Sequence, residues 1–148
     1  MYFVDRELIE KRLDYLENLL VRMAEQSGEG EDSRLVLERT GHMIIETMMD
    51  VGNQMIDGFI MRDPGSFDDI VDILLDEKVL TDEEGKGVKR LLPWRKVLLQ
   101  EYTGIDHKAL QSQFKKEMPY LLRFPGKIRM YLENELGPVS AFLPHKSD

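Results

Sequence analysis

Apolar residues recur at every third or fourth position along most of the chain, which is the spacing of one face of an amphipathic helix. In the first such segment Asp5 is expected to cap the N-terminus, and the glycine-containing turn at residues 27–30 ends the helix. The apolar positions of this segment are Leu8, Leu13, Leu16, Leu19, Leu20 and Met23. Strand-like alternation never extends beyond a few positions, so the pattern predicts an all-α protein.

The second helix is predicted to be long, from about Asp32 to Met61, which corresponds to ~45 Å at 1.5 Å per residue. Its apolar stripe is wide, and its methionines suit an adaptable packing surface. They are Met43, Met48, Met49, Met55 and Met61. These residues either fill the core or cover both a core and a second subunit. Because a single small bundle rarely needs a helix of this length, we expect a homodimer.

Turn and cap signals divide the next part of the chain. Residues 63–66, Asp-Pro-Gly-Ser, stop the second helix, and Ser66 is expected to cap a helix over residues 67–79. Thr81, followed three positions later by Glu84, indicates a capping box at the start of another helix.

Glycines and prolines indicate where helices begin, weaken or bend in the rest of the chain. Gly85 and Gly87 are expected to weaken the helix with the capping box. Pro93, a residue type favoured at the first helical position, begins a helix that runs to Tyr102. The last helix is predicted over residues 107–136, and an irregular tail follows it. This helix should bend or split at its two prolines, Pro119 and Pro125.

These elements predict a single domain over residues 1–148, an up-and-down helical bundle of about five helices with a long second helix. The composition, 42% hydrophobic and 32% charged, is that of a globular chain. The absence of cysteine excludes disulfides and thiolate metal sites and favours a reducing compartment. The sequence shows no signal-peptide pattern and no run of ~20 apolar residues for a membrane span. We therefore expect a soluble, cytoplasmic protein.

The net charge of −8 is unevenly distributed along the chain. Residues 1–85 carry 22 acidic and 8 basic side chains, whereas residues 86–148 carry 6 acidic and 12 basic ones. Such a basic half can attract phosphates locally, although the protein as a whole is acidic. The alternative is that the two halves neutralise each other inside one bundle.

Several kinds of chemistry have no support in the sequence. It has no glycine-rich phosphate loop and no HExxH motif, and its three histidines, His42, His107 and His145, are scattered. The acidic run at residues 68–77 could hold a divalent cation, but its spacing fits no EF-hand loop. A solvated helix face is the expected role of this run. We predict neither a metal nor a cofactor.

The stretch RKVLLQEY, residues 95–102, is the strongest candidate for chemistry. On a continuous helix Arg95, Leu98 and Tyr102 lie on adjoining parts of one face. In an ordinary amphipathic helix Arg95 would form a salt bridge and Leu98 and Leu99 would lie in the core. Tyr102 would then be half-buried with a hydrogen-bonded hydroxyl.

The stretch PWRKVLLQEYTGID, with ERTGHMIIETMMDVGNQMI before it, resembles the HepT-like family of the HEPN superfamily, and more narrowly its YutE-like branch. The resemblance covers nearly the whole chain. It implies an all-α homodimer in which the motif helices of two subunits line a shared cleft. Many members are metal-independent ribonuclease toxins, paired with a nucleotidyltransferase antitoxin that attaches AMP to the motif tyrosine.

The resemblance assigns roles to individual residues. Arg95 matches the motif arginine and Tyr102 the motif tyrosine, so Tyr102 would be the AMP acceptor if an antitoxin exists. Gln100 stands where the family has its catalytic histidine, and Lys96 stands where an asparagine is common. These matches make Arg95, Gln100 and Tyr102 the catalytic candidates. The substrate-binding candidates are Lys96 and three polar residues of the second helix, Arg39, Glu46 and Asp50.

Gln100 is a serious departure from the family pattern. Metal-independent RNA cleavage activates the ribose 2′-hydroxyl and protonates the leaving oxygen, which a group titrating near neutral pH does well. A glutamine amide hydrogen-bonds but does not titrate there, and losing general acid–base help typically costs ~10²–10⁴-fold. Arg95 can still bind a phosphate through two parallel hydrogen bonds. His107 is a further candidate for the missing proton transfer.

Three functions remain open on the sequence alone. The first is a HepT-like toxin whose ribonuclease activity is weak or lost. The second is a non-catalytic homodimer that binds RNA, a nucleotide or a protein partner through the same cleft. The third is a helical interaction protein whose basic half docks an acidic partner.

Overall fold

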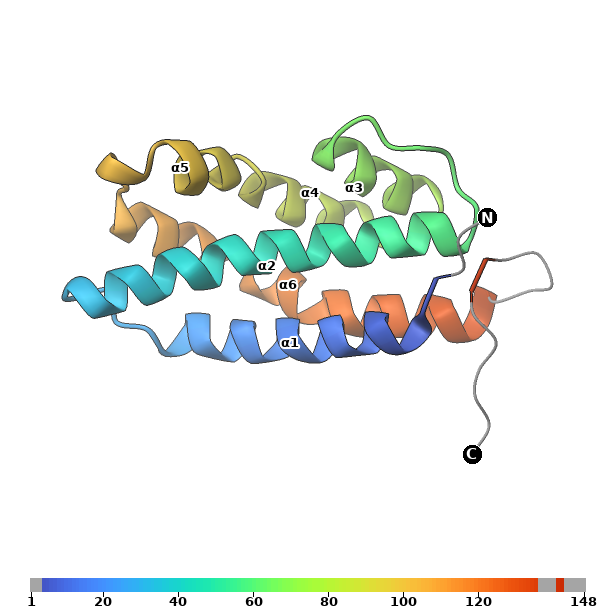
Figure 1. Cartoon of the computed structure of the whole chain (residues 1–148), viewed down its shortest axis with the longest axis horizontal. Coiled ribbons are helices and arrows are strands. Elements are labelled where there is room, and N and C mark those ends of the chain that lie inside the picture. The colour runs from blue at the N-terminus through green and yellow to red at the C-terminus, as the bar shows by residue number, and fades with distance from the viewer. Residues whose placement is uncertain (1–3, 136–140, 143–148) are drawn as a thin grey trace.

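The computed structural model describes residues 4–135 together with residues 141 and 142. These residues form six α-helices and one short 3-10 helix (Figure 1). The elements are α1 (Arg6–Glu25), α2 (Glu31–Gly58), α3 (Phe67–Asp76), α4 (Asp82–Leu91), α5 (Trp94–Gln100), η1 (Tyr102–Gly104) and α6 (His107–Glu135). The described residues contain no β-strand, only an isolated bridge between Val4 and Phe142. The all-α prediction is confirmed, with six helices rather than about five.

The predicted caps are present at the expected residues. The Asp5 side chain accepts a hydrogen bond from the backbone N–H of Glu7, at 2.9 Å. Ser66 caps α3 in the same way, and Thr81 and Glu84 form both hydrogen bonds of the predicted capping box. Each cap satisfies backbone donors that a helix start leaves without partners.

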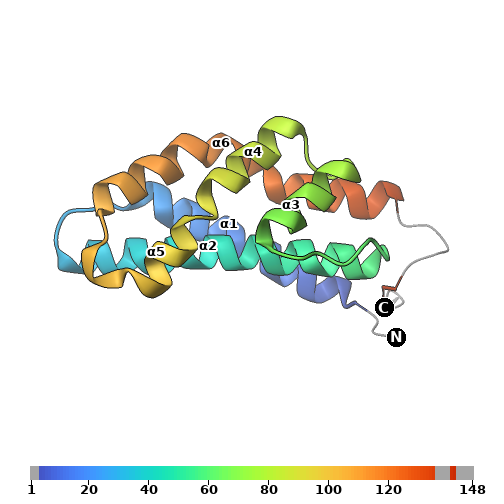
Figure 2. The same ribbon diagram turned by 90° about the horizontal axis from the view of Figure 1, so that it is seen from above.

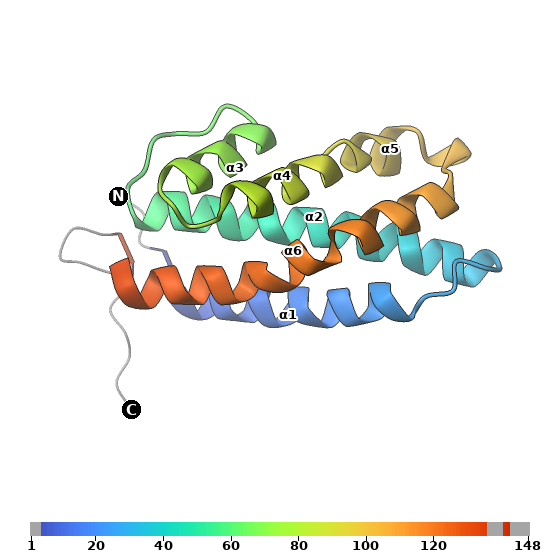
Figure 3. The ribbon, with the colours of Figure 1, turned by 180° about the vertical axis from the view of Figure 1, so that it is seen from behind.

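The long helices lie side by side. α1 and α2 run antiparallel, and α6 lies along both of them (Figures 1 and 2). α3 and α5 pack on a different side of α2, and α4, which lies between them in the chain, packs along α6. α6 continues through both prolines, and its axis changes direction near its middle (Figure 3). The predicted bend is therefore present and the predicted split is not. The predicted irregular tail lies outside the described residues, except for Ala141 and Phe142.

Three of the five methionines of the second helix, Met48, Met49 and Met55, are fully buried. The other two, Met43 and Met61, are partly buried and pack against the same core. These side chains fill the interior of the single chain. The wide apolar stripe of α2 is thus accounted for by contacts within the bundle.

The two glycines of α4 allow neighbouring helices to approach closely. A Cβ added at Gly85 would lie 2.5 Å from Leu75 of α3, and one at Gly87 would lie 2.6 Å from Tyr120 of α6. Both distances are too short for real carbon atoms. The sequence predicts a weakened helix here, but α4 is intact because its glycines are sites of helix packing.

The acidic and basic halves of the chain partly neutralise each other. On α6, Arg129 binds three carboxylates of α1, at 2.7 to 3.1 Å, namely Glu10, Asp14 and Glu17. Lys127 of α6 lies 3.9 Å from Glu84 of α4. Within the basic half itself, Arg90 of α4 binds the buried Glu117 of α6, and its hydrogen bond lowers the pKa of that carboxyl group. Part of the charge asymmetry therefore serves helix packing.

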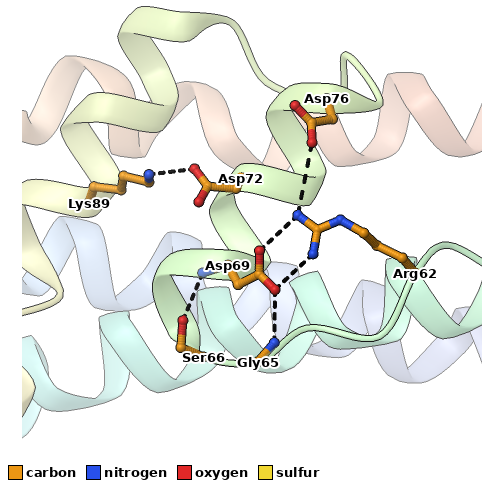
Figure 4. A network of polar contacts seen from close by, with 7 residues as sticks. All are labelled: Arg62, Gly65, Ser66, Asp69, Asp72, Asp76 and Lys89. Atoms are coloured by element: carbon orange, nitrogen blue, oxygen red, sulfur yellow. Dashed lines mark hydrogen bonds and ion pairs between the residues drawn. The ribbon is translucent and has the colours of Figure 1, made fainter.

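The acidic run of α3 also binds cationic side chains of the same protein (Figure 4). Arg62 contacts both carboxylate oxygens of Asp69, at 2.8 and 2.7 Å, and lies 3.9 Å from Asp76. Lys89 pairs with Asp72, and the backbone N–H of Gly65 also donates to Asp69. The acidic run was predicted to be a solvated helix face. Part of it instead forms ion pairs that hold the α2–α3 connection and α4 against α3.

This network predicts a pH-dependent stability. The hydrogen bonds from Arg62 and Gly65 hold the pKa of Asp69 at about 2, below the value of ~3.9 that an unfolded aspartate has. The contribution of Asp69 is therefore complete above that unfolded value and is lost as the pH falls toward 2. We expect Asp69→Asn to lower the free energy of unfolding at neutral pH and to have a smaller effect in strong acid.

Urea unfolding of both proteins at several pH values measures this difference. Asp68→Asn is the matched control, because Asp68 shares the first turn of α3 but makes no side-chain hydrogen bond with a described residue. An effect of Asp69→Asn that stays constant down to strongly acidic pH would contradict the prediction.

Candidate functional site

The motif helix α5 lies over the first half of α2 and none of its residues is fully buried (Figure 1). Pro93 precedes it as the N-cap rather than as its first residue. Trp94 and Leu98 pack partly buried against the core and fix the helix to the bundle. The rest of α5 therefore presents its side chains at the surface.

Arg95 is held in place by two residues from different helices. Its Nε lies 2.5 Å from Oε1 of Glu46 on α2. Its guanidinium carbon lies 4.8 Å from the centre of the Phe67 ring at the start of α3, a distance at which cation and ring attract each other. The two terminal nitrogens of Arg95 make no hydrogen bond with any described residue. They are the pair that can bind a phosphate with two parallel hydrogen bonds.

Beside Arg95 the surface has a hollow of about 470 Å³. Its lining contains three of the predicted site residues, Arg95, Lys96 and Gln100. The other lining residues are Phe67, Asp68, Leu92, Pro93 and Leu99. The lining thus combines two cations, one carboxylate and one amide with several apolar side chains.

Tyr102 does not share the face of α5 with Arg95. The α-helix ends at Gln100, and Tyr102 begins the 3-10 helix η1, where fewer residues complete each turn. Its side chain is 64% exposed and is absent from the lining of the hollow. The predicted continuous helix to Tyr102 is wrong. Of the features expected of an ordinary amphipathic helix, the salt bridge of Arg95 is present. The half-buried tyrosine and a core position for Leu99, which is 41% exposed, are not.

Among the α2 candidates, only Glu46 contacts the motif. Arg39 and Asp50 are exposed, line no part of the hollow and form no ion pair with a described residue. The structure therefore places Glu46 in contact with Arg95 and the other two candidates apart from it.

Two contacts of this region were not predicted. Nε2 of His42 lies 3.3 Å from the same Glu46 oxygen that binds Arg95. Nε2 of His107 lies 2.8 Å from Oε2 of Glu38. α2 carries Glu38, His42 and Glu46 at intervals of four residues, so the three side chains form a row on one helix face. This spacing is the signal in the sequence that could have indicated that they lie close together. The contact with Phe67 has no comparable signal.

The described residues contain no group of three or more histidine, aspartate or glutamate side chains that could hold a metal ion. Nor does any helix among them have the length and apolarity that crossing a membrane requires.

Comparison with known proteins connects this geometry to a family. The family model described as "Ribonuclease HepT-like" matches residues 9–128. A Bacillus subtilis (strain 168) protein, "Putative RNase YutE", is 52% identical over 143 residues, which are 96% of this chain and 99% of that protein. The solved structure of Bacillus subtilis YutE, described as a cytosolic protein of unknown function, matches with a TM-score of 0.88 over 96% of this chain and 100% of the other.

Two distant structures share the fold alone. One is a toxin–antitoxin crystal structure with AMP-PNP, with a TM-score of 0.76 and 11% identity over 84% of this chain and 99% of the other. The second is a tri-AMPylated Shewanella oneidensis HEPN toxin in complex with MNT antitoxin, with a TM-score of 0.75 and 13% identity over 84% of this chain and 98% of the other. On the family model and the 52% identity, this chain belongs to the ribonuclease HepT-like family.

Proposed function

We propose that this protein binds RNA through the hollow at Arg95, as a HepT-like protein whose ribonuclease activity is weak or lost. The observation that carries the proposal is the anchoring of Arg95. Glu46 and Phe67 fix its guanidinium, while its terminal nitrogens remain unpaired within the described residues. A preorganised arginine of this kind binds a phosphodiester without first losing the freedom of its side chain.

The reduced activity follows from Gln100. Its amide lines the hollow with Arg95 and can hydrogen-bond a phosphate oxygen or a ribose hydroxyl. It cannot take up or release a proton near neutral pH. Phosphate binding and charge stabilisation therefore persist, while the proton transfer of a motif histidine is absent. If the ribonuclease activity is lost completely, the protein is a non-catalytic binder of RNA, a nucleotide or a protein partner.

Exposed lysines near the motif support an RNA ligand. Lys96 lies in the hollow, and three exposed lysines on the first part of α6 form no ion pair with a described residue: Lys108, Lys115 and Lys116. Phosphate contacts by lysine and arginine release counterions from RNA and make affinity fall with salt concentration. These four lysines are among the basic side chains of the second half that form no ion pair with a described residue.

Replacing Arg95 tests the proposal directly. We expect Arg95→Ala to weaken binding of a single-stranded RNA oligonucleotide by about 10- to 100-fold, because hydrogen bonds to a charged group typically change a binding constant by this much. The RNA affinity of the variant should also fall less steeply with salt concentration. Fluorescence anisotropy titrations at several salt concentrations measure both effects. Arg22→Ala on α1 removes the same charge from an exposed site in a different helix and is the matched control. Equal affinities of the two variants would contradict the proposal.

A nucleotidyltransferase antitoxin is the proposed protein partner, with Tyr102 as the AMP acceptor. The exposure of the Tyr102 side chain supports this role, because an acceptor hydroxyl must enter another enzyme's active site. The Shewanella toxin of the same fold is described as tri-AMPylated and bound to an antitoxin. We expect a mass increase of whole AMP units on co-expression with such an enzyme, and none in Tyr102→Phe.

Intact-protein mass spectrometry measures the modification. Tyr15→Phe is the control, because Tyr15 is also exposed, at 43%, but lies on α1. AMP found on the Tyr102→Phe protein would assign the acceptor elsewhere.

We also propose that the protein is a cytoplasmic homodimer. Exposed apolar side chains on the motif side, Leu99 and Tyr102, support a second copy covering this region. Sedimentation equilibrium gives the mass in solution, and a monomer at micromolar concentration would rule the dimer out.

A further inference from the structure

His42 and the motif arginine share one carboxylate oxygen. Oε1 of Glu46 lies 3.3 Å from Nε2 of His42 and 2.5 Å from Nε of Arg95. The two nitrogens therefore lie no farther apart than the sum of those distances. An imidazole is thus placed beside the group that would bind the scissile phosphate, although position 100 holds no histidine.

The position of His42 is fixed by the fold and open to solvent. Its neighbour Gly41 packs against the buried ring of Phe114 on α6, which holds this turn of α2 in place. The His42 side chain keeps 21% of its surface exposed and Arg95 keeps 43%. His42 does not line the hollow, so a ligand contacts both groups by extending from Arg95 past Glu46 to the imidazole.

The contact with Glu46 sets which ring nitrogen of His42 faces the carboxylate. Nε2 lies 3.3 Å from Oε1 of Glu46, a distance that pairs the two charges when the imidazole is protonated. A neutral imidazole with its proton on Nε2 carries on Nδ1 the lone pair that a general base needs. Two further ionisable side chains lie in this region, Glu38 of α2 and His107 of α6, and they pair with each other.

We propose that His42 performs the proton transfer that Gln100 cannot perform. The inference rests on the proposed binding of RNA at Arg95. Nδ1 of His42 takes the proton of the ribose 2′-hydroxyl, and the 2′-oxygen forms a bond to phosphorus. The bond from phosphorus to the 5′-oxygen breaks, and that oxygen takes a proton from water. The imidazolium returns its proton to the resulting hydroxide, and the product ends in a 2′,3′-cyclic phosphate.

His42 is a stronger candidate for this role than His107. His107 is paired with Glu38, and no contact among the described residues links that pair to Arg95. His42, by contrast, reaches Arg95 through a single shared oxygen atom. Replacing His107 is therefore the matched control for replacing His42.

The experiment compares wild type, His42→Gln and His107→Gln in RNA binding and in cleavage of a single-stranded oligonucleotide from pH 5 to pH 8. We expect wild type to cleave slowly and to form the cyclic phosphate. His42→Gln should cleave about 100-fold or more slowly, the usual loss of a general base, and bind RNA as wild type does. Its remaining rate should lose the imidazole-dependent change with pH. His107→Gln should retain the wild-type rate.

The double variant His42→Gln/Gln100→His separates proton transfer from a structural role. If His42 only transfers a proton, a histidine at position 100 should restore cleavage in this variant. An inactive double variant would show that His42 maintains the site and would overturn the inference, as would a His42→Gln rate equal to wild type.

Two further outcomes distinguish the inference from the function on which it rests. Wild type that binds RNA in an Arg95-dependent manner without cleaving it would overturn the role of His42 and leave the proposed RNA binding intact. Wild type that binds RNA no better than Arg95→Ala would overturn both.

Discussion

Gln100→His should raise ribonuclease activity by about 100-fold, the lower end of the 10²–10⁴-fold range for a general acid–base group. Position 100 lines the same hollow as Arg95 and Lys96, so a histidine there lies with the proposed phosphate-binding residues. The side chain at position 100 is exposed, and the larger imidazole therefore fits without displacing the core. The lower end of the range is expected because His42 already contributes some proton transfer in the wild type.

Cleavage of a fluorescent RNA oligonucleotide at neutral pH measures this gain. Gln100→Asn is the matched control, since it also changes the side chain but introduces no titrating group. Arg95→Ala combined with Gln100→His should lose the gained activity, because proton transfer without phosphate binding is ineffective. If Gln100→His cleaves no faster than Gln100→Asn, the hollow is not the cleavage site.

Phe114→Ala should destabilise the protein by about 3–5 kcal/mol, the usual cost of removing a fully buried phenylalanine. Phe114 of α6 is fully buried at a junction of three helices. A Cβ added at Gly41 of α2 would lie 3.4 Å from its ring and 3.6 Å from Met23 of α1. Alanine leaves a cavity that three rigid helices cannot collapse to fill. At ~2–4 °C per kcal/mol for a domain of this size, the melting temperature should fall by roughly 6–20 °C.

Urea and thermal unfolding followed by circular dichroism measure this loss. Leu122→Ala is the matched control, because Leu122 lies on the same helix and is 60% exposed. Substitutions at such surface positions usually change stability by no more than about 0.5 kcal/mol. Equal effects of the two substitutions would show that the junction does not carry the expected packing energy.

The structure of the motif segment, residues 95–102, could be predicted only in part from the sequence. The family resemblance grouped Arg95, Gln100 and Tyr102, and the structure places Arg95 and Gln100, with Lys96, around one hollow. Tyr102 was placed on the same helix face, but the helix ends two residues earlier. A seven-residue helix gains little stability from its own hydrogen bonds. Its end is therefore set by how α5 and the start of α6 pack against α2, which a local pattern does not contain.

The helical class, the long second helix and the caps at Asp5, Ser66 and Thr81 were predictable from local sequence. These features depend on residues within one or two turns of each other, whose relative positions the helix geometry sets. Only the packing of the helices brings Arg95 to Glu46, 49 positions away, and to the carboxylate oxygen that His42 also contacts. Such contacts depend on how helices pack together, because residues distant in the chain become neighbours only when the core of the bundle is formed.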